Sequence, residues 1–187
     1  MNKYLAIFGL LWICFSVKAQ IKTSFPAEIT EKAYAVIQSN EIDFICESAT
    51  NALKKENYTV TVLDEKGKEA AHFLCMCDQF SSLNKFSGEV YDRTGNLIRK
   101  IKKSELKMSE YSSGLTTDDY MYFFECNIGQ YPYTVKYEWE IKYKNGLISF
   151  PPFAPQSRFN LSVMEANYRL HVPAEVTYRT KILNSGN

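Results

Sequence analysis

The chain has 187 residues, of which 45% are hydrophobic and 14% aromatic, and its formal net charge is +1 at pH 7. A charge balance this even provides no basic surface of the kind that nucleic acid requires, so we expect no nucleic-acid partner. The length is enough for a domain with a substantial core.

Residues 1–19 have the features of a cleavable signal peptide. A short positive start is followed by the almost wholly apolar run Tyr4–Val17 and by a small-residue cleavage site ending at Ala19. The run is too short to cross a bilayer comfortably. Lipid attachment at Cys14 is disfavoured, because Ile13 stands where a small residue is expected. We therefore predict export to the periplasm or cell surface, with no transmembrane anchor after cleavage.

Residues 20–187 form the predicted mature domain, with a net charge of −1 because the signal peptide removes two lysines and no acidic residue. Apolar residues alternate with polar ones in segments rich in β-branched and aromatic side chains, which is typical of strands. The predicted strands are Ala33–Ile37, Ile42–Glu47, Tyr58–Leu63, Ala70–Cys77, Phe86–Tyr91, Leu97–Lys102, Tyr120–Cys126, Tyr131–Tyr143, Ser162–Val172 and Glu175–Lys181. About ten strands without a long helix predict an all-β fold, a large antiparallel β-sandwich in a single domain.

The strongest of these signals is Tyr131–Tyr143, in which every odd position is apolar or aromatic and nearly every even position is polar. Successive side chains of a strand point to opposite faces, so this pattern predicts one buried and one solvated face. Ala70–Cys77 is apolar on both faces, which predicts a central strand buried on both sides. Between strands, Ser48–Lys55 is interpreted as a marginal helical turn with Ser48 as its cap.

Two segments share an Asp-x-x-Gly pattern at the end of a strand, one from Asp64 to Gly67 and one from Asp92 to Gly95. Aspartate can bond the backbone two residues on, and glycine can take the left-handed conformation that closes a hairpin with a bulge. We therefore expect both aspartates to hold hairpin turns rather than to bind a metal.

Four cysteines remain after signal cleavage: Cys46, Cys75, Cys77 and Cys126. Export permits disulfides, and all four are candidates. Cys75 and Cys77 share one face of a strand but are poorly placed to bond each other, so the pairings allowed are Cys46 with one and Cys126 with the other. The alternative is four buried thiols that pack as small hydrophobic residues. A four-cysteine zinc site is disfavoured by the spacing.

The sequence offers no convincing catalytic group. Cys126 and His171 are a possible nucleophile and base, but Cys126 ends a strand and lacks the surroundings that activate a thiol. Glu138 and Glu140 share a face at a spacing that a glycosidase could use, yet they alternate with lysines as on a solvated sheet face. We expect no catalytic residues, no metal site and no cofactor.

Aromatic residues provide the best candidates for binding. Those of the long strands could form a platform for sugar rings, or they could fill a wide core, as aromatic side chains commonly do. They are Tyr120, Tyr122, Tyr131, Tyr133, Tyr137, Trp139 and Tyr143. Phe150, Phe153 and Phe159 lie instead in a proline-rich loop, where exposure would create an apolar contact surface. We predict that these three form the interaction surface.

Three stretches resemble a known family: VYDRTGNLIRKIKKSEL from Val90, YPYTVKYEWEIKYKNGLISF from Tyr131, and YRLHVP from Tyr168. They are similar to the N-terminal domain of unknown function that precedes transglutaminase-like, papain-like domains in exported bacterial proteins. The resemblance covers most of the mature chain and implies an antiparallel β-sandwich. It also implies that a catalytic domain follows and that the sandwich continues beyond Asn187, so residues 20–187 are expected to be truncated at the C-terminal end. No catalytic position of the family has a match here.

Together these features favour a non-catalytic exported module that positions or shields a downstream catalytic domain or a protein partner through the phenylalanine-rich loop. A carbohydrate- or peptidoglycan-binding module that uses exposed aromatic residues is the alternative, with a cell-wall glycan as its ligand. A free-standing hydrolase is the third possibility, and it would require a reactive thiol.

Overall fold

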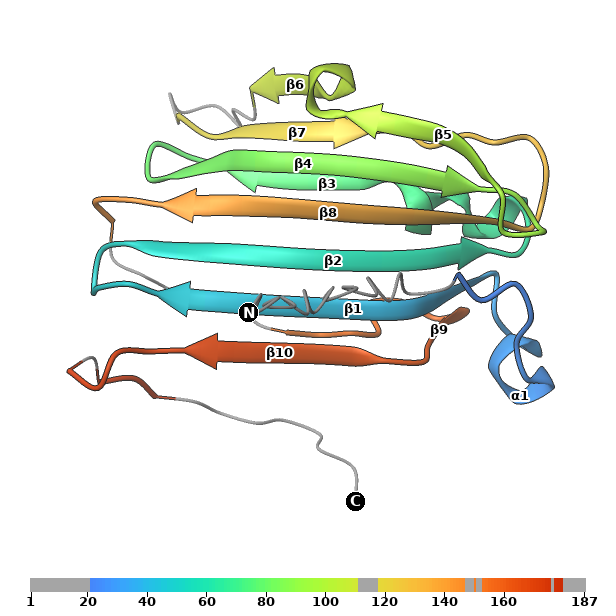
Figure 1. Ribbon diagram of the computed structural model, residues 1–187, viewed down its shortest axis with the longest axis horizontal. Coiled ribbons are helices and arrows are strands. Elements are labelled where there is room, and N and C mark those ends of the chain that lie inside the picture. The colour runs from blue at the N-terminus through green and yellow to red at the C-terminus, as the bar shows by residue number, and fades with distance from the viewer. Residues whose placement is uncertain (1–20, 111–117, 147–149, 151–152, 176, 180–187) are drawn as a thin grey trace, which may run out of the picture.

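The computed structural model describes residues 21–110, 118–146, 150, 153–175 and 177–179. The predicted signal peptide lies outside the described residues. Within them the chain forms two β-sheets with little helix, and Figure 1 shows the smaller sheet over the β4–β5 side of the larger one. The prediction of an all-β sandwich with about ten strands is confirmed.

The larger sheet has the strand order β10-β1-β2-β8-β4-β5, and β9 also pairs with β1. Its members are β1 (Ala35–Cys46), β2 (Ala52–Val62), β4 (Ser81–Tyr91), β5 (Leu97–Lys102), β8 (Tyr133–Tyr143), β9 (Leu161–Val163) and β10 (Ala166–His171). The smaller sheet has the order β3-β7-β6, from β3 (Phe73–Cys77), β7 (Tyr120–Phe124) and β6 (Lys107–Glu110). The helical pieces are α1 (Ala27–Thr30) and the 3-10 turns Glu65–Ala71 and Lys103–Glu105.

β8 is a central strand of the large sheet, and it has the one buried and one solvated face that its alternation predicted. It pairs antiparallel with β2 on one side and with β4 on the other. Its odd-numbered side chains face the core: Tyr133, Val135, Tyr137 and Ile141 are buried. Lys142 and Glu138 point to solvent. The pattern of β8 therefore shows which face of the large sheet is exposed to solvent.

β1 makes the two exceptions to antiparallel pairing, because both β9 and β10 run parallel to it. Parallel neighbours require a long crossover connection rather than a hairpin. More than a hundred residues separate β1 from β9 along the chain, so this condition is met. β1 also replaces two predicted strands by one continuous strand, with an irregularity between Ile37 and Ser39.

Three local predictions are wrong. Ser48–Lys55 forms no helical turn, because β2 begins at Ala52 after a tight turn in which the Ser48 hydroxyl accepts a hydrogen bond from the Asn51 N–H. Ala70–Cys77 is not a central strand, since its first residues belong to a 3-10 turn and the rest form β3 at an edge of the small sheet. The described residues Thr177–Arg179 are not in a strand, although Glu175–Lys181 was predicted as one.

The two Asp-x-x-Gly segments have different structures. Asp92 holds the predicted β4–β5 hairpin turn, and Gly95 has the left-handed φ of 84°. Asp64 instead caps the 3-10 turn Glu65–Ala71, where its carboxylate accepts a hydrogen bond from the Lys66 N–H at 2.8 Å. Gly67 lies so close to the Tyr34 carbonyl that a Cβ would overlap it. Both glycines are thus structural, but only one closes a hairpin.

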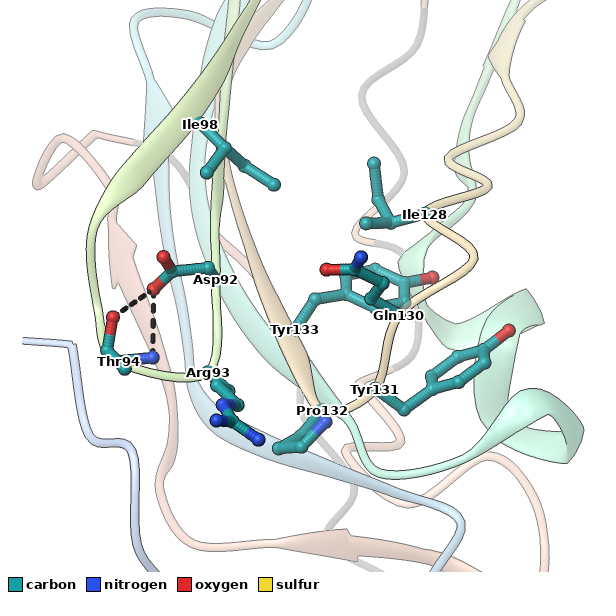
Figure 2. Close-up of a pocket in the computed structure, with 9 residues that line it drawn as sticks. All are labelled: Asp92, Arg93, Thr94, Ile98, Ile128, Gln130, Tyr131, Pro132 and Tyr133. Atoms are coloured by element: carbon teal, nitrogen blue, oxygen red, sulfur yellow. Dashed lines mark hydrogen bonds between the residues drawn. The ribbon is translucent and has the colours of Figure 1, made fainter.

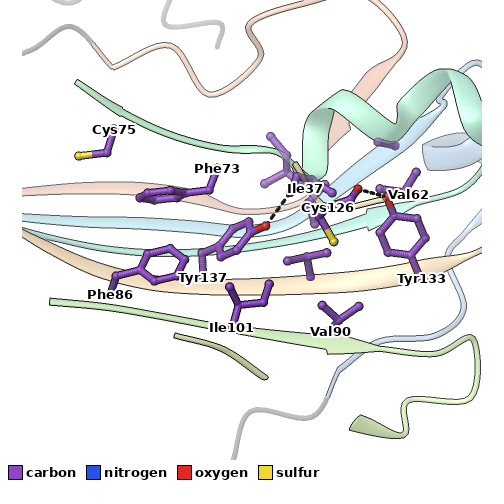
Figure 3. Close-up of a cluster of buried hydrophobic side chains, with 14 of the residues drawn as sticks. Ile37, Val62, Phe73, Cys75, Phe86, Val90, Ile101, Cys126, Tyr133 and Tyr137 are labelled. Atoms are coloured by element: carbon purple, nitrogen blue, oxygen red, sulfur yellow. Dashed lines mark hydrogen bonds between the residues drawn. The ribbon is translucent and has the colours of Figure 1, made fainter. Parts of the chain in front are cut away.

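The core between the two sheets is rich in aromatic side chains (Figure 3). Phe73 of β3 contacts Phe86, Tyr137 and Trp139 of the large sheet, with ring centroids 4.5–5.5 Å apart. The Tyr137 hydroxyl donates to the Ala71 carbonyl at 2.8 Å, which satisfies its polar end. The Phe73 ring thus ties the small sheet to β8, and the Tyr137 hydroxyl ties the preceding 3-10 turn to it.

Candidate functional site

The predicted phenylalanine surface is not one surface. The Phe150 ring packs edge-on against Phe44 with centroids 5.4 Å apart, and Phe153 lies 5.6 Å from Tyr168. Both are half-buried against the inner face of β1 and β10. Phe159 is 94% exposed. The structure therefore leaves only Phe159 available to a partner.

The aromatic platform is not available to sugar rings either. Each of the seven side chains proposed for it is buried or half-buried and belongs to the core or packs against it. Trp139, for example, has Phe73 edge-on to its ring at 5.3 Å and the Lys54 ammonium over it at 5.9 Å. The interpretation that aromatic residues fill a wide core fits the structure.

All four cysteines are buried and unpaired, so the pairings considered from the sequence are not formed. The Cys46 thiol donates to the Ser48 carbonyl at the end of β1, and Cys126 lies in the core. Cys75 and Cys77, which were considered poorly placed to bond each other, have sulfur atoms 3.8 Å apart. The strand spacing of these two residues, not the even cysteine count, decides which sulfurs meet.

The candidate catalytic groups do not converge. Cys126 is buried in the core, and burial raises the pKa of its thiol to about 11. His171 is exposed on the outer face of the large sheet, 3.5 Å from Asp43. Glu138 and Glu140 are each paired with a lysine on that same outer face. Within the part of the chain that the structure describes, no three His, Cys, Asp or Glu side chains come together as a metal site would require.

A pocket of about 450 Å³ lies at one end of the sandwich, between the β4–β5 turn and the segment that leads into β8 (Figure 2). Its lining combines polar and aromatic side chains: Asp92, Arg93, Thr94, Ile98, Ile128, Gln130, Tyr131, Pro132 and Tyr133. Two of these have structural roles. The Tyr133 hydroxyl donates to the Cys126 carbonyl, and Asp92 is engaged in its own turn.

Asp92 is held by four donors of the hairpin. Its carboxylate accepts hydrogen bonds from the Thr94 hydroxyl at 2.7 Å, from the N–H groups of Thr94 and Asn96 at 2.8 and 2.9 Å, and from the Asn96 amide at 3.2 Å. The bond from the Thr94 hydroxyl is the largest cause that lowers the pKa of Asp92 to about 2. Because its acceptor sites are used within the turn, Asp92 has little capacity left for a ligand.

The outer face of the small sheet is apolar across β3 and β7, and sequence reasoning missed it. Leu74 and Met76 alternate with the buried residues of β3 and point outward, with exposed fractions of 59% and 48%. In the antiparallel register they lie opposite Phe123 and Met121 of β7, so all four share one face. We call these four residues the small-sheet face.

The polar side chains of this side of the small sheet lie on the β6 edge, where Lys107 and Ser109 are opposite Phe123 and Met121. The Lys107 ammonium lies 5.8 Å from the centre of the Phe123 ring at its border. The sequence signal was present, because Ala70–Cys77 is apolar at both odd and even positions. That pattern was interpreted as burial on both sides of the strand, whereas the second side is open.

Comparisons with known proteins identify a family and a fold. A family model described as "Domain of Unknown Function with solved-structure structure (DUF3857)" matches residues 51–187. Twenty chains of solved structure match, among them a "putative protease" from Parabacteroides distasonis with 10% sequence identity and a TM-score of 0.53. The match covers 60% of this chain but 24% of that one, so the chain spans about a quarter of that structure's length. At this identity the likeness shows the fold alone.

No curated protein matches the chain. No helix among the described residues has the length and apolar character needed to cross a membrane.

Proposed function

The chain belongs to the DUF3857 family of domains of unknown function, and from this premise we propose that it is a non-catalytic docking domain. Its small-sheet face binds a neighbouring catalytic domain or a separate protein. The observation that carries the proposal is the outward apolar side chains of β3 and β7, in a sandwich whose other outer face is charged. A contiguous apolar patch on an exported domain marks a contact surface more often than a solvated one.

The energetics are consistent with a docking role. Fully burying a leucine or methionine side chain stabilises by about 1.5–3 kcal/mol, and Leu74 and Met76 have roughly half of that still to gain. Met121 and Phe123 are half-buried and widen the patch. A flat face of this kind suits a preformed partner, because a rigid sheet has little conformational entropy to lose on binding.

The kind of partner is suggested by the longer proteins that contain this fold. The matched region is 24% of the similar chain from Parabacteroides distasonis. That chain is described as a putative protease. The sequence itself resembles the module that precedes transglutaminase-like domains. We therefore propose that the partner is an exported domain of the papain-like hydrolase class, joined to this domain or bound to it.

Site-specific photo-crosslinking in the producing cells tests the proposal. A photoreactive amino acid at Met76 should give one discrete adduct, either a shifted intramolecular form or a product with a single second protein. The same amino acid at Glu138, on the opposite outer face, is the matched control and should give no adduct. Equal adducts from both positions, or none from Met76, would contradict the proposal.

The second candidate function is glycan binding, now confined to the pocket of Figure 2. There Arg93, Gln130 and Tyr131 provide the planar and hydrogen-bonding side chains that sugar sites use. Calorimetric titration with peptidoglycan fragments tests this candidate. Binding that Tyr131→Ala and Gln130→Ala remove, and that Met76→Ser leaves unchanged, would favour it over docking; no heat at millimolar fragment would dismiss it.

A further inference from the structure

The inner face of β3 brings together two thiols that the docking proposal does not use. Cys75 and Cys77 are each 3% exposed, and their sulfur atoms are 3.8 Å apart. Residues two apart in a strand point to the same face, which explains the meeting. We propose that Cys75 and Cys77 form a two-thiolate site for a soft, two-coordinate metal ion, with Cu(I) as the biological candidate.

The separation of the sulfur atoms suits an ion between them better than a bond. A disulfide needs sulfurs about 2.05 Å apart and Cβ atoms within about 4.5 Å. In an extended strand, the Cα atoms of alternate residues are about 6.6 Å apart. This is near the upper limit of the Cα–Cα distance that a disulfide can span. Metal–thiolate bonds are about 2.3 Å long, so an ion between two sulfurs holds them up to about 4.6 Å apart. A small side-chain rotation from 3.8 Å gives that separation.

The Cys75 and Cys77 thiols are close enough to share a hydrogen bond, in which either can be the donor. Tyr120, which pairs with Cys77 across β3 and β7, donates its hydroxyl to the Ser81 carbonyl at 3.4 Å and leaves the two thiols to each other. A cation bound between the two sulfur atoms would take the place of the hydrogen bond between the thiols.

The chemistry of the site selects the metal. Among the described residues, no third His, Cys, Asp or Glu side chain lies with the pair. The site therefore lacks the four ligands that zinc prefers. Soft thiolate ligands select both Cu(I) and zinc, and of these two Cu(I) is the ion that two thiolates alone can hold, in a linear arrangement. Binding releases both thiol protons and leaves a complex with one negative charge.

Competition with a chromophoric Cu(I) chelator under anaerobic, reducing conditions tests the site. The purified chain should withdraw one Cu(I) per molecule. Cys75→Ser and Cys77→Ser should each weaken binding at least 100-fold, whereas Cys126→Ser, which removes another buried thiol, should leave it unchanged. Failure of the unaltered chain to compete, or equal loss in Cys126→Ser, would overturn the proposal.

X-ray absorption of the Cu(I)-loaded, unaltered chain keeps the proposal testable if the serine variants do not fold. Two sulfur neighbours and no nitrogen or oxygen neighbour are expected. Any other set of atoms bound to the copper ion would overturn the proposal. Peptide mapping that found a Cys75–Cys77 disulfide in protein from its own cells would also overturn it, because an oxidised pair cannot ligate.

Discussion

The two outer faces of this sandwich carry different kinds of side chain. On the large sheet, the outward side chains of neighbouring strands are charged and joined in pairs, such as Lys85–Glu140 at 3.1 Å and Arg169–Asp43 at 2.7 Å. On the small sheet, Leu74 and Met76 point outward instead. Both faces are sheet surfaces of the same chain, so secondary structure does not explain the difference. The difference is the basis of our proposal that a protein surface covers the small-sheet face.

The largest effect is expected where the two sheets are joined. Tyr137→Ala removes a buried ring between Phe73 and Phe86 and should lower the free energy of unfolding by about 3–5 kcal/mol. Tyr137→Phe keeps the ring but leaves the Ala71 carbonyl without its donor, so about 1 kcal/mol is expected. Urea denaturation measures both. Equal effects of the two substitutions would show that the hydroxyl, not the ring, joins the sheets.

The small-sheet face should lower the solubility of the isolated domain and contribute little to its free energy of unfolding. The double substitution Leu74→Ser, Met76→Ser should change the free energy of unfolding by less than about 1 kcal/mol, because both side chains are already largely exposed. It should also reduce the fluorescence of a bound hydrophobic dye. Val60→Ser, at a fully buried position of β2, is the control and should unfold the domain instead. A large loss of stability in the double variant would mean that the face serves the fold.

The charged face should give only small coupling energies. A double-mutant cycle of Lys85→Ala and Glu140→Ala should yield about 0.2–1 kcal/mol, since Lys85 is 71% exposed and salt screens such pairs. Repeating the cycle at high salt should reduce the coupling further. A coupling above about 2 kcal/mol would contradict the view that this face is simply solvated.

The smallest effect concerns pH. The hydrogen bond from Arg169 is the largest cause that lowers the pKa of Asp43, with His171 adding to it. A depressed folded pKa adds stability that is present above the unfolded value near 3.8 and is lost as pH falls through the folded value. Asp43→Asn should therefore reduce stability at pH 7 slightly and hardly at all at pH 2. Thermal melts at the two pH values compare the variant with the unaltered chain; an equal loss at both would place the effect in packing.

Sequence reasoning succeeded where one local pattern had one structural meaning. The alternation of Tyr131–Tyr143 fixed both faces of β8, and Asp92 with Gly95 fixed a hairpin. It failed where tertiary contacts decide. The apolar residues of β3 look alike whether they are buried or open, and the parallel pairing of β10 with β1 joins segments far apart in the chain.

The candidate site was harder to predict than the fold for the same reason. Phe150 and Phe153 have the sequence context of exposed loop residues, yet Phe44 and Tyr168 of distant strands cover them. Phe159, in the same loop, has no such cover. Local context cannot distinguish the three, because what covers each ring comes from elsewhere in the fold.

Oxidative footprinting of the domain, alone and within its native assembly, tests the central claim most directly. Hydroxyl radicals label exposed leucine, methionine and phenylalanine side chains, so Leu74 and Met76 should react in the isolated domain. In the assembly we predict that both are protected while Phe159 reacts as before. Protection of Phe159 with Leu74 and Met76 unchanged would contradict the account and return the interaction to the phenylalanine-rich loop.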